Sequence, residues 1–323
     1  MPRIVVALFV LAASAAALQP AAAQTITTPP PVSGRSLSSP ESITAADVIA
    51  RLVLAHENLE LIRTYMGQPK PTAPFFTVSG VSDSEAFIAS LNLTRRVHQL
   101  AFEQLRVEQH FDSDLPAKPA AHHIYGGVDA LLVIALQIQT ELGISSSIAE
   151  RPQPDSASMT DVFNQVLVTG QLMNTLLDKK TQADDVFLVL TVTVRQALEL
   201  HQKYSTKLMP DEPAFVANKT PSDVLGELET SYKLIKDLAD PMNVSMLTFN
   251  RSNVSREATS NDVFGFALII IAELNELMAA SGVMPLKRKV GTLKRKFPSH
   301  AYQRARFLNS IIRETLQAQP KKR

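Results

Sequence analysis

The stretch SNDVF at residues 260–264 decides the fold, because related stretches recur along the chain. Close versions are AADVI (45–49), MTDVF (159–163), DDVF (184–187) and PSDVL (221–225). Each of them joins an acid to a valine and a large apolar residue. The recurring acid has three conceivable roles: a ligand, a catalytic group or part of a helix start. The residues around it favour the helix start.

Weaker copies (SEAF, HHIY and SHAY) complete a series of eight when the acid or histidine is taken as the marker. The markers are Asp47, Glu85, His123, Asp161, Asp185, Asp223, Asp262 and His300. Their successive spacings are 38, 38, 38, 24, 38, 39 and 38 residues. The single short step divides the series into two sets of four, which align at an offset of 138–139 residues. The spacing therefore predicts an internal duplication of a four-element unit.

Each marker is followed by about 20 residues with helical periodicity. In residues 223–240, for example, apolar positions recur in steps of three and four and form one stripe. We therefore predict an all-α protein with eight helices in two duplicated four-helix units, arranged as a helical bundle or a helical-repeat array with long connectors. The expected helices lie near residues 45–66, 83–109, 121–142, 159–178, 183–206, 221–239, 260–281 and 298–318. The seventh is the most apolar around its circumference and is expected at the centre.

Five markers complete the pattern Ser/Thr-x-x-Asp/Glu, which is typical of a capping box at a helix N-terminus. The predicted pairs are Thr44 with Asp47, Ser82 with Glu85, Ser158 with Asp161, Thr220 with Asp223, and Thr259 with Asp262. Such a cap contributes about 1 kcal/mol to stability. Gln182 stands in the cap position before Asp185, and the copies at His123 and His300 lack both halves of the box. The recurring acids are accordingly interpreted as structural.

Most connectors run about 11–20 residues, which is long for a helical bundle. A connector of that length can return along its helix, so that successive helices lie parallel, or can merely decorate an up-and-down bundle. The sequence leaves both arrangements open. Apolar patches at 75–78 and 215–216 predict that the connectors pack on the helices.

The ends of the chain differ from the helical body. Residues 1–23 have Arg3, an apolar run and a final Ala-Ala-Ala, which predicts a secretory signal peptide. Residues 24–42 are rich in Pro, Ser and Thr and predict a disordered linker. The expected units are then 43–181 and 182–319, followed by a basic tail, 320–323. No transmembrane segment is expected in the mature chain, and the predicted location is periplasmic or secreted in a bacterium.

Charge is distributed unevenly. Residues 283–323 contain twelve Lys/Arg and one acid, whereas residues 1–282 contain 20 Lys/Arg and 30 acids. The aligned segment of the first unit has no such basic run. We therefore predict that the basic C-terminal region contacts an anionic partner, either a protein or a membrane or envelope component. The candidate binding residues are Lys287, Arg288, Lys289, Lys294, Arg295, Lys296 and Arg304.

Motifs for catalysis and cofactor binding are scarce. The chain has no cysteine, which excludes disulfides and thiolate metal sites. No nucleophile elbow, phosphate loop or di-iron signature occurs, and no cofactor is expected. His56 and Glu60 lie on one side of the first helix and are weak metal-ligand candidates.

The sequence favours an exported, non-enzymatic helical binding or scaffold protein. One alternative is a bundle that binds a small ligand, metal or haem between its helices, and another is an enzyme of unrecognised type. Nucleic acid is not an expected partner, because the basic run lacks interleaved aromatic residues. The sequence leaves the oligomeric state and the identity of the ligand open.

Overall fold

The computed structural model describes residues 42–107, 119–146, 148–205, 209–252, 255–283 and 295–319. Within these residues the chain forms eight α-helices and two short strands, so the protein is all-α as the sequence predicts. The expected signal peptide, all of the expected linker except its last residue, and the expected basic tail lie outside the described residues.

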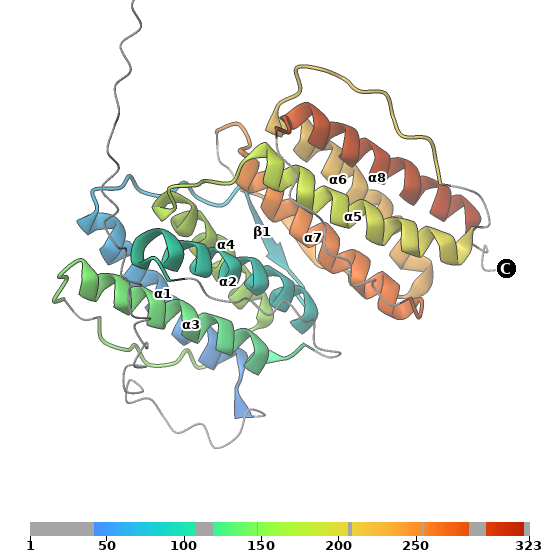
Figure 1. The fold of residues 1–323 in the computed structure, drawn as a ribbon. Helices are drawn as coiled ribbons and strands as arrows, with labels where there is room; N and C mark the ends of the chain where they lie inside the picture. Colours follow the sequence, from blue (N-terminus) through green and yellow to red (C-terminus); the bar gives the residue numbers. More distant parts are fainter. Residues whose placement is uncertain are drawn as a thin grey trace, which may run out of the picture. The chain divides into compact units, whose positions relative to one another are not determined.

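The helices of the first unit are drawn from blue to green in Figure 1, and those of the second from yellow-green to red. The first unit contains α1 (Ala45–Tyr65), α2 (Asp83–Leu105), α3 (Ala121–Glu141) and α4 (Met159–Leu176). The second contains α5 (Ala183–Tyr204), α6 (Pro221–Ala239), α7 (Ser260–Ala280) and α8 (Pro298–Ala318). A short 3₁₀ turn, Asp240–Met242, follows α6, and the strands are β1 (Phe76–Ser79) and β2 (Thr248–Arg251).

All eight helices begin at the residue that the marker predicts, but several end earlier than expected. The largest difference is in α2, which ends at Leu105 because Arg106 adopts a left-handed conformation (φ 58°) and closes the helix. Gly143 and Gly282, which align in the duplication, have φ of 70° and 68° just beyond α3 and α7. Glycine adopts this conformation without the steric cost of a Cβ atom.

The same contacts between helices recur in the two units. In the first unit α1 and α2 each pack against both α3 and α4, and in the second α5 and α6 each pack against both α7 and α8. The main contacts in each unit therefore form a ring of four helices. In the first unit α1 and α2 lie diagonally opposite each other, and so do α3 and α4. This correspondence is what an internal duplication predicts.

The helices of each unit run parallel. In α1 and α3, Arg51 bonds Asp129, and further along both helices Gln139 Nε2 bonds Asn58 Oδ1 at 2.9 Å. In the other helix pairs too, a later residue of one helix contacts a later residue of its neighbour. For α2 and α4 the pairs are Arg96 with Gly170 and Glu103 with Asp178. For α6 and α8 they are Lys219 with Ser299 and Ser231 with Asn309, and for α5 and α7 they are Gln196 with Asn275 and Tyr204 with Ser281. The long connectors therefore return along the helices, which resolves the arrangement that the sequence left open.

Helix α7 lies at the centre, as its apolar sequence predicts, and joins the units. It packs against α5 and α6 of its own unit and against α2 and α4 of the other. Across this junction Arg96 bonds Asn261, while Glu85, earlier in α2, contacts Glu273, later in α7. The order reverses, so α2 and α7 are antiparallel. The buried apolar side chains form one continuous core through both units.

The strands add a second link between the units. β1, in the connector before α2, pairs antiparallel with β2, in the connector before α7, from Phe76 opposite Arg251 to Ser79 opposite Thr248. The ring of Phe266 in α7 packs edge-on against those of Phe76 and Phe249 at centroid distances of 5.4 and 4.8 Å. The sequence did not predict these strands.

The connector patches differ in burial. Phe76 and Val78 are buried, as the sequence predicts. The second patch packs only loosely on the helices, since Phe215 and Val216 are 50% and 36% exposed. The Phe215 ring lies beside the ring of His300 at 5.1 Å instead of entering the core.

Helices α3 and α7 are long and apolar enough to span a membrane by length and composition. Core helices of globular proteins meet the same criteria. Because α7 packs against four other helices, we interpret its apolar surface as core packing.

Candidate functional site

The recurring acids cap the helices. Both halves of a capping box form at the starts of α1, α2, α4, α6 and α7, where the cap hydroxyl accepts a hydrogen bond from the acid's backbone N–H and the acid accepts one from the cap residue's N–H. The residues are Thr44, Asp47, Ser82, Glu85, Ser158, Asp161, Thr220, Asp223, Thr259 and Asp262.

The other three helices keep half of the box. Nδ1 of His123 and of His300 each accepts a hydrogen bond of 3.1 Å from the backbone N–H three residues earlier, and Asp185 Oδ2 accepts one of 2.9 Å from Gln182. The prediction that the histidine copies lack both halves is therefore wrong, because an imidazole nitrogen accepts as a carboxylate does. These three helices therefore lack only the hydrogen bond to a side chain at the cap position.

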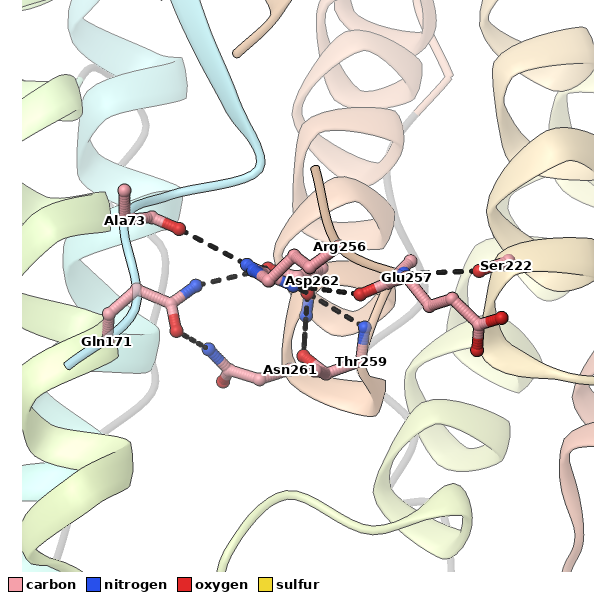
Figure 2. A network of polar contacts seen from close by, with 9 residues as sticks. Ala73, Gln171, Ser222, Arg256, Glu257, Thr259, Asn261 and Asp262 are labelled. Carbon is pink, nitrogen blue, oxygen red and sulfur yellow. Dashed lines mark hydrogen bonds and ion pairs between the residues drawn. The ribbon is translucent and has the colours of Figure 1, made fainter. Parts of the chain in front are cut away.

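Asp262 differs from the other capping acids because it is buried at the junction of the units (Figure 2). Beyond its cap bonds to Thr259, it accepts two hydrogen bonds from Arg256, at 2.6 and 2.9 Å, and one from Gln171 of α4 at 3.2 Å. Arg256 also donates to the carbonyl of Ala73, and Asn261 donates to Gln171. This network connects α4, α7 and the connector before β1.

The network keeps Asp262 ionised. Burial disfavours the charged carboxylate, but the hydrogen bonds from Arg256 and Thr259 outweigh it and lower the pKa of Asp262. The side chain of Asp262 is fully buried and that of Arg256 is 19% exposed. The pair therefore resembles a buried salt bridge, whose loss on one side is costly.

Two buried glutamates also face each other at the junction of the units. Glu85 of α2 is 1% exposed and Glu273 of α7 is fully buried, and each carboxyl group affects the pKa of the other. Ser82 N–H donates to Glu85 at 2.5 Å, and Leu247 N–H donates to Glu273 at 3.0 Å. Burial and the neighbouring carboxylate raise the pKa of Glu273 to about 9. Glu273 is therefore protonated at neutral pH, and burial also raises the pKa of Glu85.

A cavity of about 290 Å³ opens beside this junction. Its polar lining includes Asn92, Arg95, Arg96, Gln99, Glu103, Lys179, Thr181 and Asp185, and its apolar lining includes Phe102, Leu177 and Phe264. The lining comes from α2, from the segment between α4 and α5, and from the starts of α5 and α7. Arg96, Asn92 and Phe264 also line an adjacent space of about 50 Å³. This cavity is the candidate ligand site.

Arg96 holds the segments around the cavity together. Its guanidinium donates to the carbonyl of Gly170 at 3.2 Å, to Thr181 Oγ1 at 2.7 Å and to Asn261 Oδ1 at 2.5 Å. Burial and the neighbouring charge of Arg95 lower the pKa of Arg96 to about 10. It therefore stays protonated at neutral pH.

The predicted basic binding residues are only partly described. Lys287, Arg288, Lys289 and Lys294 lie outside the described residues. Arg295 is exposed, whereas Arg304 forms an ion pair with Glu212 at 3.4 Å. The ammonium of Lys296 lies 4.8 Å from the ring centre of Phe187. Two of the three described residues thus hold intramolecular contacts.

The weak metal candidates have other partners. His56 Nδ1 lies 3.3 Å from Thr169 Oγ1, and Glu60 forms an ion pair with Arg63 at 2.7 Å. Burial lowers the pKa of His56. Within the part of the chain that the structure describes, no group of three or more His, Asp or Glu side chains is placed to hold a metal ion.

Sequence reasoning did not select Arg96, Arg256 or Glu273. A signal for two of them is present: Arg96 falls on the apolar stripe of α2, and Glu273 interrupts the most apolar helix. A charged residue on a buried face is informative because burial of an unpaired charge is expensive. Arg256 lies in a connector and has no periodic pattern to mark it.

No family model, no curated protein and no solved structure matches this chain.

Proposed function

We propose that this protein is an exported, non-enzymatic binding protein that takes a small ligand at the junction of its two four-helix units. The observation that carries the proposal is the 290 Å³ cavity, which combines polar and apolar side chains from separate segments. Small-molecule sites have this mixed lining, and the volume lies just below their usual range of about 300–1,000 Å³. The signal-peptide pattern of residues 1–23 supports export.

Binding is favoured over catalysis because the acids nearest the cavity already hold structural partners. Glu103 accepts hydrogen bonds from the backbone N–H groups of Asp178 and Lys179 at 2.8 and 3.4 Å. Asp185 completes the half cap with Gln182. A general acid or base instead needs a carboxyl group that is free to exchange a proton with the substrate.

A thermal-shift screen with uncharged, cationic and anionic compounds tests the proposal. A ligand at 100 times its Kd stabilises the folded state by about 2.7 kcal/mol, so at least one class is expected to raise the melting temperature by a few degrees. Asn92→Phe, which fills the cavity, should abolish the shift. Gln202→Phe, at an exposed site on α5, should retain it. If no compound distinguishes the wild type from Asn92→Phe, the proposal is wrong.

The second candidate is a surface contact between the basic region, residues 283–323, and an anionic partner. Its support is the charge pattern, twelve basic residues against one acid. A duplicated unit that acquires charge in only one copy is consistent with a gained surface role.

A further inference from the structure

Arg96 is a buried cation without a carboxylate partner. The residue is 7% exposed, and its three hydrogen bonds all end on neutral oxygens, those of Gly170, Thr181 and Asn261. Among the residues that the structure describes, no carboxylate forms an ion pair with it. The guanidinium of Arg96 has five N–H donors, and two of them make no hydrogen bond with the described residues.

Three other partly or fully buried arginines pair with carboxylates. Arg51 pairs with Asp129, Arg63 with Glu60 and Arg256 with Asp262. Arg96 instead has Arg95 as its charged neighbour, and this repulsion adds to the cost of burial. The negative charge of Asp185 offsets part of this repulsion through space. The Asp185 carboxylate already accepts a hydrogen bond from Gln182 N–H at 2.9 Å. An unneutralised buried charge is expensive unless a counter-ion accompanies it.

The cavity beside Arg96 carries further positive charge. Arg95 and Lys179 both line it and are exposed, and the structure gives neither charged group a partner among the described residues. The lining also includes Glu103, whose carboxylate accepts hydrogen bonds from Gln99, Asp178 and Lys179. The cavity thus has three cationic side chains against two acids that are otherwise engaged.

The rest of the lining is apolar. Leu177 and Phe264 are buried, and Phe102 is 46% exposed although it is a large hydrophobic residue. These side chains suit an apolar body rather than a bare inorganic ion. The small volume limits that body to about one ring or a short chain.

We propose that the cavity binds a small organic anion whose acidic group pairs with Arg96, with Arg95 and Lys179 at its entrance and with Phe102 against its apolar part. This inference rests on the proposed function and names the ligand class for the same site. The anion supplies the counter-charge that the folded chain does not give Arg96.

Isothermal titration of the full chain with benzoate, and with uncharged benzamide as its isostere, tests the inference. Benzoate is expected to bind at least about 10-fold more tightly than benzamide, because charge-assisted hydrogen bonds are worth that much or more. Affinity for benzoate should fall when NaCl is raised from 50 to 500 mM, since exposed charges are screened. Equal affinities for the two probes would overturn the inference.

Variants assign the roles of the three cations. Arg96→Gln should weaken benzoate by about 10-fold or more and leave benzamide unchanged. Arg95→Gln and Lys179→Gln, at exposed sites, should each weaken benzoate by about 2–5-fold. Lys233→Gln, an exposed lysine on α6, is the matched control and should have no effect. If Arg96→Gln does not fold, the Arg95→Gln/Lys179→Gln double variant carries the test, and unchanged affinity there contradicts the inference.

The outcomes separate this inference from the proposed function. In one outcome, an uncharged compound binds the wild type better than benzoate does and fails to bind Asn92→Phe. That result would support a ligand site at the junction but contradict the inference that its ligand is an anion. Absence of any compound sensitive to Asn92→Phe would overturn both.

Discussion

The proton that Glu273 holds beside Glu85 makes the free energy of unfolding depend on pH. Burial and the neighbouring carboxylate raise the pKa of Glu273 to about 9, well above that of an exposed glutamate. Between about pH 4.5 and pH 9 the folded state therefore holds a proton that the unfolded chain releases. Stability should fall as pH rises through this window, by at most about 1.4 kcal/mol per pH unit. Urea denaturation at several pH values measures the slope.

Substitution isolates this pair. Glu273→Gln replaces the titrating carboxyl group with a neutral amide of the same shape, so the slope should flatten. Glu141→Gln, at an exposed position near the end of α3, is the control and should leave the slope unchanged. A slope that persists in Glu273→Gln would show that other groups cause the pH dependence.

Asp262 and Asp223 occupy the same capping position in different surroundings, and their substitutions should differ in cost. Asp262→Asn should destabilise the protein by about 3 kcal/mol, because it leaves Arg256 without its buried partner. Asp223→Asn should cost about 1 kcal/mol or less, because that acid is partly exposed and serves mainly as a cap. Chemical denaturation with an unchanged m value measures both. Equal costs would mean that the ion pair adds nothing to the cap.

The residue-scale predictions succeeded where the chemistry is local. Thr259 and Asp262 are three residues apart, so the capping bond follows from helix geometry alone. The contact between Asp262 and Gln171 of α4 spans 91 positions and depends on how the units pack. Periodicity within one helix carries no information about that distance, and the candidate cavity at Arg96 remained unpredicted for the same reason.

Helix α5 has an incomplete N-terminal cap that one substitution can complete. Its cap position holds Gln182 in an extended conformation, and Asp185 already supplies the return half of the box. Gln182→Thr adds the missing hydroxyl and should stabilise the protein by about 0.5–1 kcal/mol. Gln182→Ala removes the amide without adding an acceptor and serves as the control. A thermal midpoint for Gln182→Thr no higher than that of Gln182→Ala would contradict this reading of the cap.

Helix starts were predictable from the sequence, and helix direction was not. The caps mark the first turn, so all eight starts coincide with their predicted residues. Direction depends on the course of the connectors, and a long connector is compatible with parallel and antiparallel neighbours. The strands were missed because each is four residues long and its partner lies about 170 residues away. A single short strand has no periodic pattern to detect.

At the scale of the whole molecule, the shared core predicts one cooperative unfolding transition. α7 packs on helices of both units, and the buried apolar side chains form one cluster, so neither unit retains its full core if the other unfolds. Scanning calorimetry should give one transition, with calorimetric and van't Hoff enthalpies in agreement. Two separate transitions would indicate that the units are thermodynamically independent domains.

The packing between the units breaks the symmetry that the duplication predicts. β1 lies in the connector between α1 and α2, whereas β2 lies in the connector between α6 and α7, and these connectors are not equivalent in the repeat. The contact of α2 with α7 likewise joins the second element of one unit to the third element of the other. The sequence repeat accounts for the helices and contacts that the two units share. The junction and its cavity are formed by strands and helix contacts that the units do not share.

The basic region is predicted to contact an anionic surface. Residues 287–289 lie outside the described part of the chain, and their role stays a sequence prediction. If the region contacts an anionic surface, the protein should bind phosphatidylglycerol vesicles and not phosphatidylcholine vesicles, and 500 mM NaCl should release it. Neutralising Lys287, Arg288 and Lys289 should weaken binding by about 100-fold, because each basic residue near such a surface contributes about 1 kcal/mol.

A matched variant separates a local contact from the effect of net charge. Neutralising Lys180, Lys203 and Lys233 removes the same charge from exposed positions elsewhere in the described chain. Since a specific contact depends on position, this control should keep nearly all of the affinity. Equal losses in the two variants would show that the vesicles respond only to total charge. Undiminished binding in both would exclude the basic segment from the contact and leave the junction cavity as the candidate site.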